Sequence, residues 1–238
     1  MDILHKTALG GAGLAMALLA TFTTAPALAG MPHASHTAFY ELSIGRVDAK
    51  SNIVDARGRM VAEWRLTCEG WTTNQRLIVS MAPGEGEPIA SEVTMTSFES
   101  LDGKAYSFDS ETKVGGETIE LVRGKAKRPG PGQPGSARYS KPRGLVLELP
   151  GNTVFPFEHT IEVLKAAERG ERRAFSYYFD GSQPDIAPMA ANSLILGKSR
   201  QAREGAQNTF GKLSDAKWWS VRLAMFDGQA AGSGNEAP

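Results

Sequence analysis

The sequence predicts a mainly β protein built from antiparallel strands, with a single helix. From His36 onward, apolar and polar residues alternate in runs of strand length, which is the period of a half-buried strand. The links between these runs are short and polar, which favours antiparallel neighbours over parallel strands joined by helices. The 26 glycines and 13 prolines can supply the turns that such a fold needs.

Residues 1–29 are predicted to be a secretory signal peptide. Residues 8–22 carry no charge, and Ala27-Leu28-Ala29 puts small side chains where a signal peptidase reads them, so cleavage is expected between Ala29 and Gly30. The alternative is a membrane anchor, but the uncharged run is shorter than the ~20 residues that a membrane span needs. Because no later segment is long and apolar enough, we expect the mature protein not to span a membrane.

About ten strands are expected in residues 30–227, which we predict to form one β-rich domain. The expected strands are 38–44, 60–66, 71–81, 89–98, 105–113, 117–122, 144–149, 174–179, 193–196 and 218–226. In the second of them, Met60, Ala62 and Trp64 fall on one face. Asp102-Gly103 and Gly115-Gly116 are expected hairpin turns, because glycine tolerates the positive φ of tight turns.

Residues 156–170 have helical spacing. Phe157, Ile161 and Leu164 share one face, Pro156 suits the first turn, and Gly170 suits the C-terminal end. We expect this helix to cover one open end of the sheet. Residues 228–238 have no core-forming pattern and are expected to be a disordered tail.

The charge is balanced overall but unevenly distributed. With 26 basic and 26 acidic residues, the chain lacks the basic excess of a nucleic-acid-binding protein. Residues 121–147, however, contain seven bases and no acid: Arg123, Lys125, Lys127, Arg128, Arg138, Lys141 and Arg143. Residues 129–135, PGPGQPG, predict a flexible loop at its centre. The segment is interpreted either as a contact for anionic envelope material, such as lipid headgroups, or as a solvated loop facing the acidic hairpins.

Common catalytic motifs give no convincing match, so no catalytic residue and no cofactor is expected. Ser110 and Lys113 fit S-x-x-K, but strand alternation puts them on opposite faces. Residues 130–135 fit G-x-G-x-x-G, but Pro131 and Pro134 remove amide donors that a phosphate would need.

No metal site is expected either. His159 and Glu162 are one helical turn apart, but a site needs three or four ligands. We therefore interpret His159 as a histidine on the polar side of the first helical turn, bonding a loop carbonyl. The single cysteine, Cys68, is followed by Glu69, which opposes a reactive thiolate. In an oxidising compartment a lone cysteine indicates a missing disulfide partner.

Several blocks together resemble the EipB-type cell-envelope-integrity family of Gram-negative bacteria. They are SHTAFYEL at 35–42, GRM at 58–60, CEGW at 68–71, LPGNTVFPFEHT at 149–160 and FDG at 179–181. The resemblance covers residues 33–227. Its motif residues are His36, Tyr40, Gly70, Trp71, Phe155, Pro156, Glu158, His159 and Thr160.

The resemblance implies a periplasmic, non-enzymatic protein that helps to maintain the envelope and whose loss sensitises cells to envelope stress. The implied fold is an antiparallel, spiral-like, broken β-barrel with one inserted helix, similar in shape to the lipoprotein carriers LolA and LolB. Family members pair the cysteine at the position of Cys68 with a second one near their C-terminus, after several more strands. The resemblance therefore implies that this chain is C-terminally short, with Cys68 unpartnered and one sheet edge open.

The favoured function is binding of an envelope component, which would be a lipid, a lipoprotein or a periplasmic protein. One alternative is a periplasmic hydrolase acting on cell wall or lipid. Its best candidates are His159 with Glu158 or Glu162, but no nucleophile lies at a recognisable spacing. The other alternative is a purely structural module that binds another envelope protein through an exposed sheet edge.

Overall fold

The structure is a computed structural model that describes residues 33–45, 47, 51–185, 188–198 and 218–228. The predicted signal peptide, its cleavage site at Ala29 and Gly30, and residues 229–238 of the predicted tail lie outside the described residues. The elements are β1 (His36–Ser43), β2 (Ile53–Leu66), β3 (Gly70–Pro83), β4 (Ile89–Ser100), β5 (Ala105–Val114), β6 (Glu117–Lys127), β7 (Gly135–Lys141), β8 (Val146–Leu149), β9 (Thr153–Val154), α1 (Pro156–Glu168), β10 (Arg173–Tyr178), β11 (Met189–Lys198) and β12 (Trp219–Phe226).

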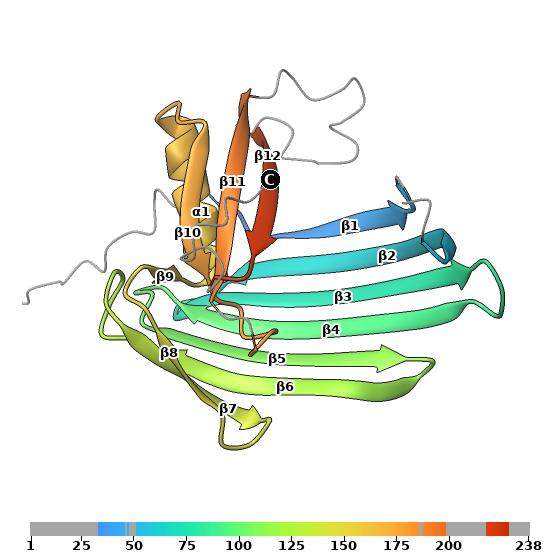
Figure 1. The fold of residues 1–238 in the computed structure, drawn as a ribbon. Coiled ribbons are helices and arrows are strands. Elements are labelled where there is room, and N and C mark those ends of the chain that lie inside the picture. The colour runs from blue at the N-terminus through green and yellow to red at the C-terminus, as the bar shows by residue number, and fades with distance from the viewer. Residues whose placement is uncertain (1–32, 46, 48–50, 186–187, 199–217, 229–238) are drawn as a thin grey trace, which may run out of the picture. The chain divides into compact units, whose positions relative to one another are not determined.

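Strands β1 to β8 form one antiparallel sheet in which the order in space repeats the order in the chain (Figure 1). In the described residues β1 and β8 are its two edges, so this sheet does not close on itself. The predicted mainly β, broken-barrel fold with one helix is thereby confirmed. Trp64 lies opposite His36, and Met60 lies opposite Tyr40, so the alternation predicted for the first two strands is also correct. The expected hairpins form with positive φ at Gly103, Gly115 and Gly116.

The basic segment has a connection at its centre, where the loop of residues 129–135 was predicted, but the residues on both sides of it form longer strands than expected. Strand β6 continues to Lys127, and β7 begins at Gly135, so only the residues between them form a connection. Ala126, Ala137 and Tyr139 are buried and alternate with exposed cations. Alternation therefore exists here, but small or polar-tipped residues at the buried positions weaken its signal.

A second sheet has the order β12-β11-β10-β9. Strands β9 and β10 pair in parallel, which corrects the expectation of antiparallel strands throughout. Parallel neighbours require a crossover connection, and helix α1 is that connection. The parallel pairing consists of Thr153 opposite Tyr177 and Val154 opposite Tyr178.

Helix α1 begins at Pro156 as predicted, and Gly170 has the positive φ expected just past a helix end. Its fully buried residues are His159, Val163, Ala166 and Ala167, whereas Phe157, Ile161 and Leu164 of the predicted face are only half-buried. The reason is that the helix packs its small residues closely against β10 and β11, with Ile195 in the same cluster. Its first turn meets the larger sheet, where Phe157 stacks on Trp71 of β3.

The main core lies where the first turn of α1 and the segments around it cover the larger sheet. Its members come from β5 to β8 and from the chain before α1 and after β10: Tyr106, Phe108, Val122, Ala126, Ala137, Tyr139, Leu149, Phe155 and Phe179. We call the covered side of the sheet, which carries Tyr106 and Ala126, its inner face, and the opposite side its outer face.

Candidate binding site

The N-terminus of α1 is capped by a side chain from a distant strand. Phe155 occupies the N-cap position and has no side-chain acceptor. Glu99 of β4 takes this role: its two carboxylate oxygens accept hydrogen bonds from the backbone N–H groups of Phe157, at 2.7 Å, and Glu158, at 3.0 Å. The negative charge of a carboxylate at this position also interacts favourably with the positive end of the helix dipole.

Glu99 is buried, with 5% of its surface exposed. Burial raises its pKa to about 7, against the smaller lowering effect of the two backbone N–H groups. The charge of Arg128 also lowers this pKa, and that of Glu158 raises it. The site therefore contains a carboxyl group whose pKa lies near neutral pH.

Arg128 fixes the same end of the helix from the other side. Its guanidinium is buried; it donates to the carbonyl oxygens of Gly103 and Thr153, both at 2.6 Å, and to the carboxylate of Glu158. The guanidinium also lies 4.6 Å from the ring centroid of Phe155. This arginine is a structural group of the interior, and it does not belong to the exposed charge of the basic segment.

His159 is buried, which corrects its predicted place on the polar side of the helix. Its Nδ1 lies 2.8 Å from the hydroxyl oxygen of Ser176, where a loop carbonyl was expected, and its ring meets Tyr178 edge-on. Burial lowers the pKa of His159, so its neutral form is favoured. Glu162 lines a different pocket, so the two side chains considered as a metal pair do not share one cavity.

Aromatic rings cluster in the fold where the residues before β1 come close to the first turn of α1. Trp71 stacks on Phe157 with ring centroids 4.3 Å apart, and His36 stacks on Trp64 at 4.6 Å. His33 meets Trp71 edge-on at 5.1 Å. Burial, with a smaller contribution from the nearby His36, lowers the pKa of His33 to about 4. The Nε1 of Trp71 and the Nε2 of His33 are buried and have no hydrogen-bond partner in the described structure.

These groups surround a pocket of about 220 Å³, which we call the inner pocket. Side chains from β2 to β5, the first turn of α1, the region of β10 and the strand β12 contribute to it. The lining residues are His33, Trp64, Trp71, Thr73, Gln75, Met95, Ser97, Glu99, Tyr106, Pro156, Phe157, His159, Thr160, Tyr178, Asp180, Leu223 and Met225. No lysine or arginine occurs in this described lining, which combines aromatic and apolar side chains with polar ones such as Gln75 and Ser97 and with the carboxyl groups of Glu99 and Asp180.

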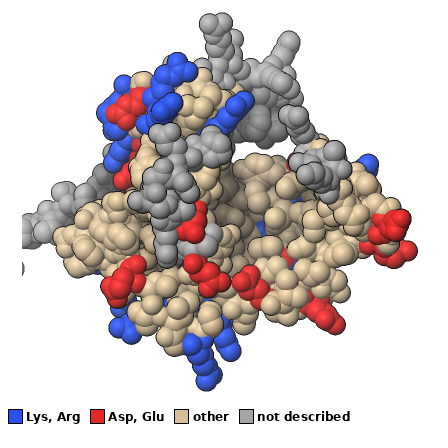
Figure 2. Space-filling view, viewed as in Figure 1, with Lys and Arg blue, Asp and Glu red and all other residues tan. Residues whose placement is uncertain are grey.

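The inner face continues beyond the inner pocket as an apolar surface. Strand register puts Met60 opposite Leu77 and Leu77 opposite Val93, on the same face as the pocket residue Met95. These three side chains are only partly buried. Leu223 of β12, which lines the pocket, is 49% exposed. Figure 2 shows a recess between the sheet and the elements drawn above it.

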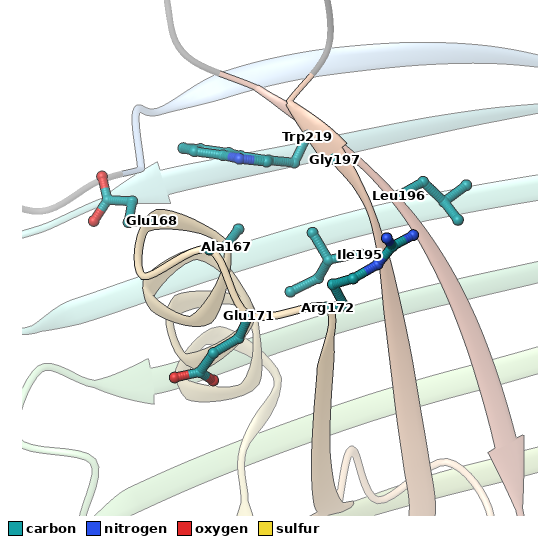
Figure 3. A pocket seen from close by; sticks show the side chains of 9 residues that line it. Ala167, Glu168, Glu171, Arg172, Ile195, Leu196, Gly197 and Trp219 are labelled. Carbon is teal, nitrogen blue, oxygen red and sulfur yellow. The ribbon is translucent and has the colours of Figure 1, made fainter.

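A separate pocket of about 450 Å³ lies at the C-terminal end of α1 (Figure 3). Ile195 and Trp219 border it beside Ala167, whereas the carboxylates of Glu168 and Glu171 point away. None of the motif residues predicted from the sequence lines this pocket. The inner pocket is the stronger candidate site for that reason.

The structure brings several motif residues together and separates others. Trp71, Pro156, His159 and Thr160 line the inner pocket, and His36 stacks on its lining residue Trp64. Three others support its walls from behind: Phe155 in the core, Glu158 through its contact with Arg128, and Gly70, which lies against the backbone of Glu99. Tyr40 lies on the inner face of β1, outside the pocket lining, and Cys68 is an exposed free thiol in the turn between β2 and β3.

Gly70 is required by a close approach of two strands. A Cβ atom at this position would lie 2.2 Å from the carbonyl oxygen of Glu99 and 2.7 Å from the ring of Phe98. The absent side chain therefore lets β3 approach the backbone that carries the capping carboxylate.

Sequence reasoning missed Glu99, Tyr178, Asp180 and Leu223 as site residues. The predicted fourth strand stopped at Phe98, so the acidic residue after it was not recognised as inward-facing. A usable signal was the helix itself, because it starts after Phe155 without a residue that can cap it.

In the described residues, no helix combines the length and apolarity that a membrane span requires. The same residues contain no group of three or more His, Cys, Asp or Glu side chains arranged to hold a metal ion.

Comparison with known proteins finds relatives that match most of the chain. A family model described as EipB-like matches residues 27–238. The chain is 34% identical, over 195 residues, to the cell envelope integrity protein EipB of Brucella abortus (strain 2308); the match covers 81% of this chain and 68% of that protein. It is also similar to the crystal structure of a β-barrel-like protein of a domain of unknown function, DUF1849, from Brucella abortus. That likeness has a TM-score of 0.74 and 32% identity, and it covers 82% of this chain and 80% of the other.

Proposed function

The chain belongs to the EipB-like family, and from this premise we propose that it supports cell-envelope integrity in the periplasm by binding. The proposed ligand is an amphipathic envelope molecule, a lipid or the lipid part of a lipoprotein. Its acyl chain lies along the apolar inner face and ends in the inner pocket.

The observation that carries this proposal is the continuity between the inner pocket and the apolar inner face. Trp64, Met95 and Leu223 line the pocket, and Leu77 and Val93 continue the same face outward. A ligand that covered these side chains would remove apolar surface from water, at about 25 cal/mol for each Å². The absence of lysine and arginine from the described lining favours an uncharged chain over an anionic headgroup at the pocket end.

Native mass spectrometry of the protein purified from its own envelope tests this proposal. We expect a bound species whose mass corresponds to an acylated molecule and which is released by organic extraction. If the protein is free of lipid in every gentle preparation, acyl-chain binding is wrong. Recovery of a stable protein partner without lipid would instead favour the structural interaction module.

A second candidate function, hydrolysis, rests on the contact between His159 Nδ1 and the Ser176 hydroxyl, because a serine paired with a histidine is a common nucleophile. Against it, both side chains are buried and they line different pockets. If Ser176→Ala folds normally and complements a deletion strain fully, hydrolysis through this pair is excluded. Loss of complementation with unchanged stability and unchanged ligand content would support it.

A further inference from the structure

The outer face of β6 and β7 carries a row of cations that have no ionic partner in the described structure. We call Lys125, Lys127, Arg138 and Lys141 the basic face, and the exposed Arg143 follows in the adjoining turn. All four are exposed. In Figure 2, lysine and arginine side chains project from the lower margin of the molecule, where Figure 1 shows β6 and β7.

The arrangement of these cations is unfavourable for the fold alone. Lys125 lies directly opposite Arg138 in the β6–β7 pair, and like charges at this position destabilise a sheet. In the described structure no nearby carboxylate forms an ion pair with the row: Asp109 pairs with Arg123, and Glu148 of β8 lies on the same face opposite Ser136. The alternative of a solvated loop facing the acidic hairpins does not describe this surface, since the cations occupy a paired sheet.

The basic face points away from the proposed ligand. Ala126 and Ala137 are buried on the inner face, and the cations alternate with them. The inner and outer faces are opposite sides of one sheet, so Lys125 and Arg138 do not reach a molecule in the inner pocket. These cations therefore suit a partner on the outside of the sheet.

Exposed apolar residues adjoin the cations. Val146 lies directly opposite Arg138 and is 43% exposed, and Leu121, two residues before Arg123 in β6, is 37% exposed. Cations that flank apolar side chains suit the interface of an anionic bilayer, where the charges meet phosphates and the apolar groups enter the headgroup region. An anionic polymer would provide charges for the cations but no apolar region for these side chains to enter.

We propose that the basic face docks the protein on an anionic lipid surface through the phosphates of the headgroups. The docked orientation leaves the inner pocket on the other side of the sheet, free to exchange its ligand. This interaction is independent of the proposed acyl-chain binding, so either can fail without the other.

Vesicle co-sedimentation tests the proposal, with phosphatidylcholine vesicles compared to phosphatidylcholine–phosphatidylglycerol vesicles. We expect binding to the anionic vesicles alone, and weaker binding as salt increases. The double variant K125Q/R138Q should bind on the order of 30-fold more weakly, because each cation near an anionic surface contributes about fivefold. Its thermal stability should not fall, since the substitution relieves a like-charge contact.

The matched control is R59Q/R173Q, which removes two exposed arginines from β2 and β10 and so makes the same change in net charge. It should bind anionic vesicles within about twofold of the unmodified protein. Equal binding to both kinds of vesicle, or an equal loss in both double variants, would overturn the proposal. Preferential binding of free polyphosphate over vesicles would overturn it too, and would identify the face as a polymer site.

Discussion

The carboxylate of Glu99 in strand β4 accepts a hydrogen bond of 2.7 Å from the backbone N–H of Phe157, the second residue of helix α1. This contact joins residues 58 positions apart in the sequence and brings the larger sheet to the start of the helix. It therefore determines where the wall formed by Pro156, Phe157 and His159 stands in the inner pocket.

Replacing Glu99 by alanine should destabilise the protein. The substitution leaves two helix N–H groups without an acceptor, and each lost capping bond costs about 1 kcal/mol, so we expect a loss of about 2 kcal/mol. Urea denaturation measures it. Glu99→Gln, which retains one acceptor oxygen, should lose less. If alanine and glutamine lose equally little, the capping role is wrong.

The proton affinity of Glu99 makes stability depend on pH. Its pKa is about 7 in the folded protein against an ordinary value of 4.5, so between these values the folded state holds a proton that the unfolded state has released. The free energy of unfolding should therefore fall by about 3 kcal/mol as pH rises through this window.

The difference between the unmodified protein and Glu99→Gln isolates this effect. The lowered pKa values of His33 and His159 act in the opposite direction, but they occur in both proteins and cancel. We expect Glu99→Gln to gain relative stability from about pH 5 to about pH 8. A constant difference over this range would contradict the raised pKa.

Gly70→Ala should be severely destabilising, by about 3 kcal/mol or more, because the added methyl group meets backbone that has no room to move. Gly45→Ala is the matched control: nothing lies within 4 Å of a Cβ atom there, and its effect should stay within about 0.5 kcal/mol. Thermal unfolding of the two variants provides the comparison. Equal melting temperatures would show that β3 and β4 can separate without loss.

Neighbouring residues of β3 separate the two faces of the sheet in a ligand-binding test. Leu77 belongs to the inner face, and Ile78, which is 41% exposed, belongs to the outer face. We expect Leu77→Asp to lose the bound acyl species in native mass spectra and Ile78→Asp to keep it, because only the first introduces a charge into the ligand's path. Retention of ligand by both variants would place the acyl chain elsewhere.

The predictable parts of the fold are the elements in which the pattern of apolar and polar residues is complete within one short stretch of the chain. The existence of the strands β1 to β5 and the start of α1 follow from period and turn residues, and the structure confirms them, although β2 begins at Ile53, before the predicted start at residue 60. Strand β7 was missed because its buried positions include Ala137 and its exposed ones carry charge. The parallel pairing of β9 was missed because two residues leave no periodic signal.

The candidate site was less predictable because its groups meet only in three dimensions. Trp71, Pro156 and His159 were identified through a family resemblance, and the inner pocket includes all three. Glu99 acts on a helix 58 residues away, and the partner of His159 is Ser176, which is on another strand. No spacing rule connects such residues, so neither contact follows from sequence alone. The signal peptide stays a prediction.

The strand order of the larger sheet has a consequence for the synthesis of the protein. Each strand from β2 to β8 pairs with the one made just before it, so the sheet can grow at one edge as the chain emerges. Its cover, however, comes from residues after Leu149, including Phe155 and Phe179. Until that last third of the chain arrives, Tyr106 and Phe108 stand on a bare apolar surface. During this interval the incomplete chain exposes an aggregation-prone surface of the kind that chaperones shield.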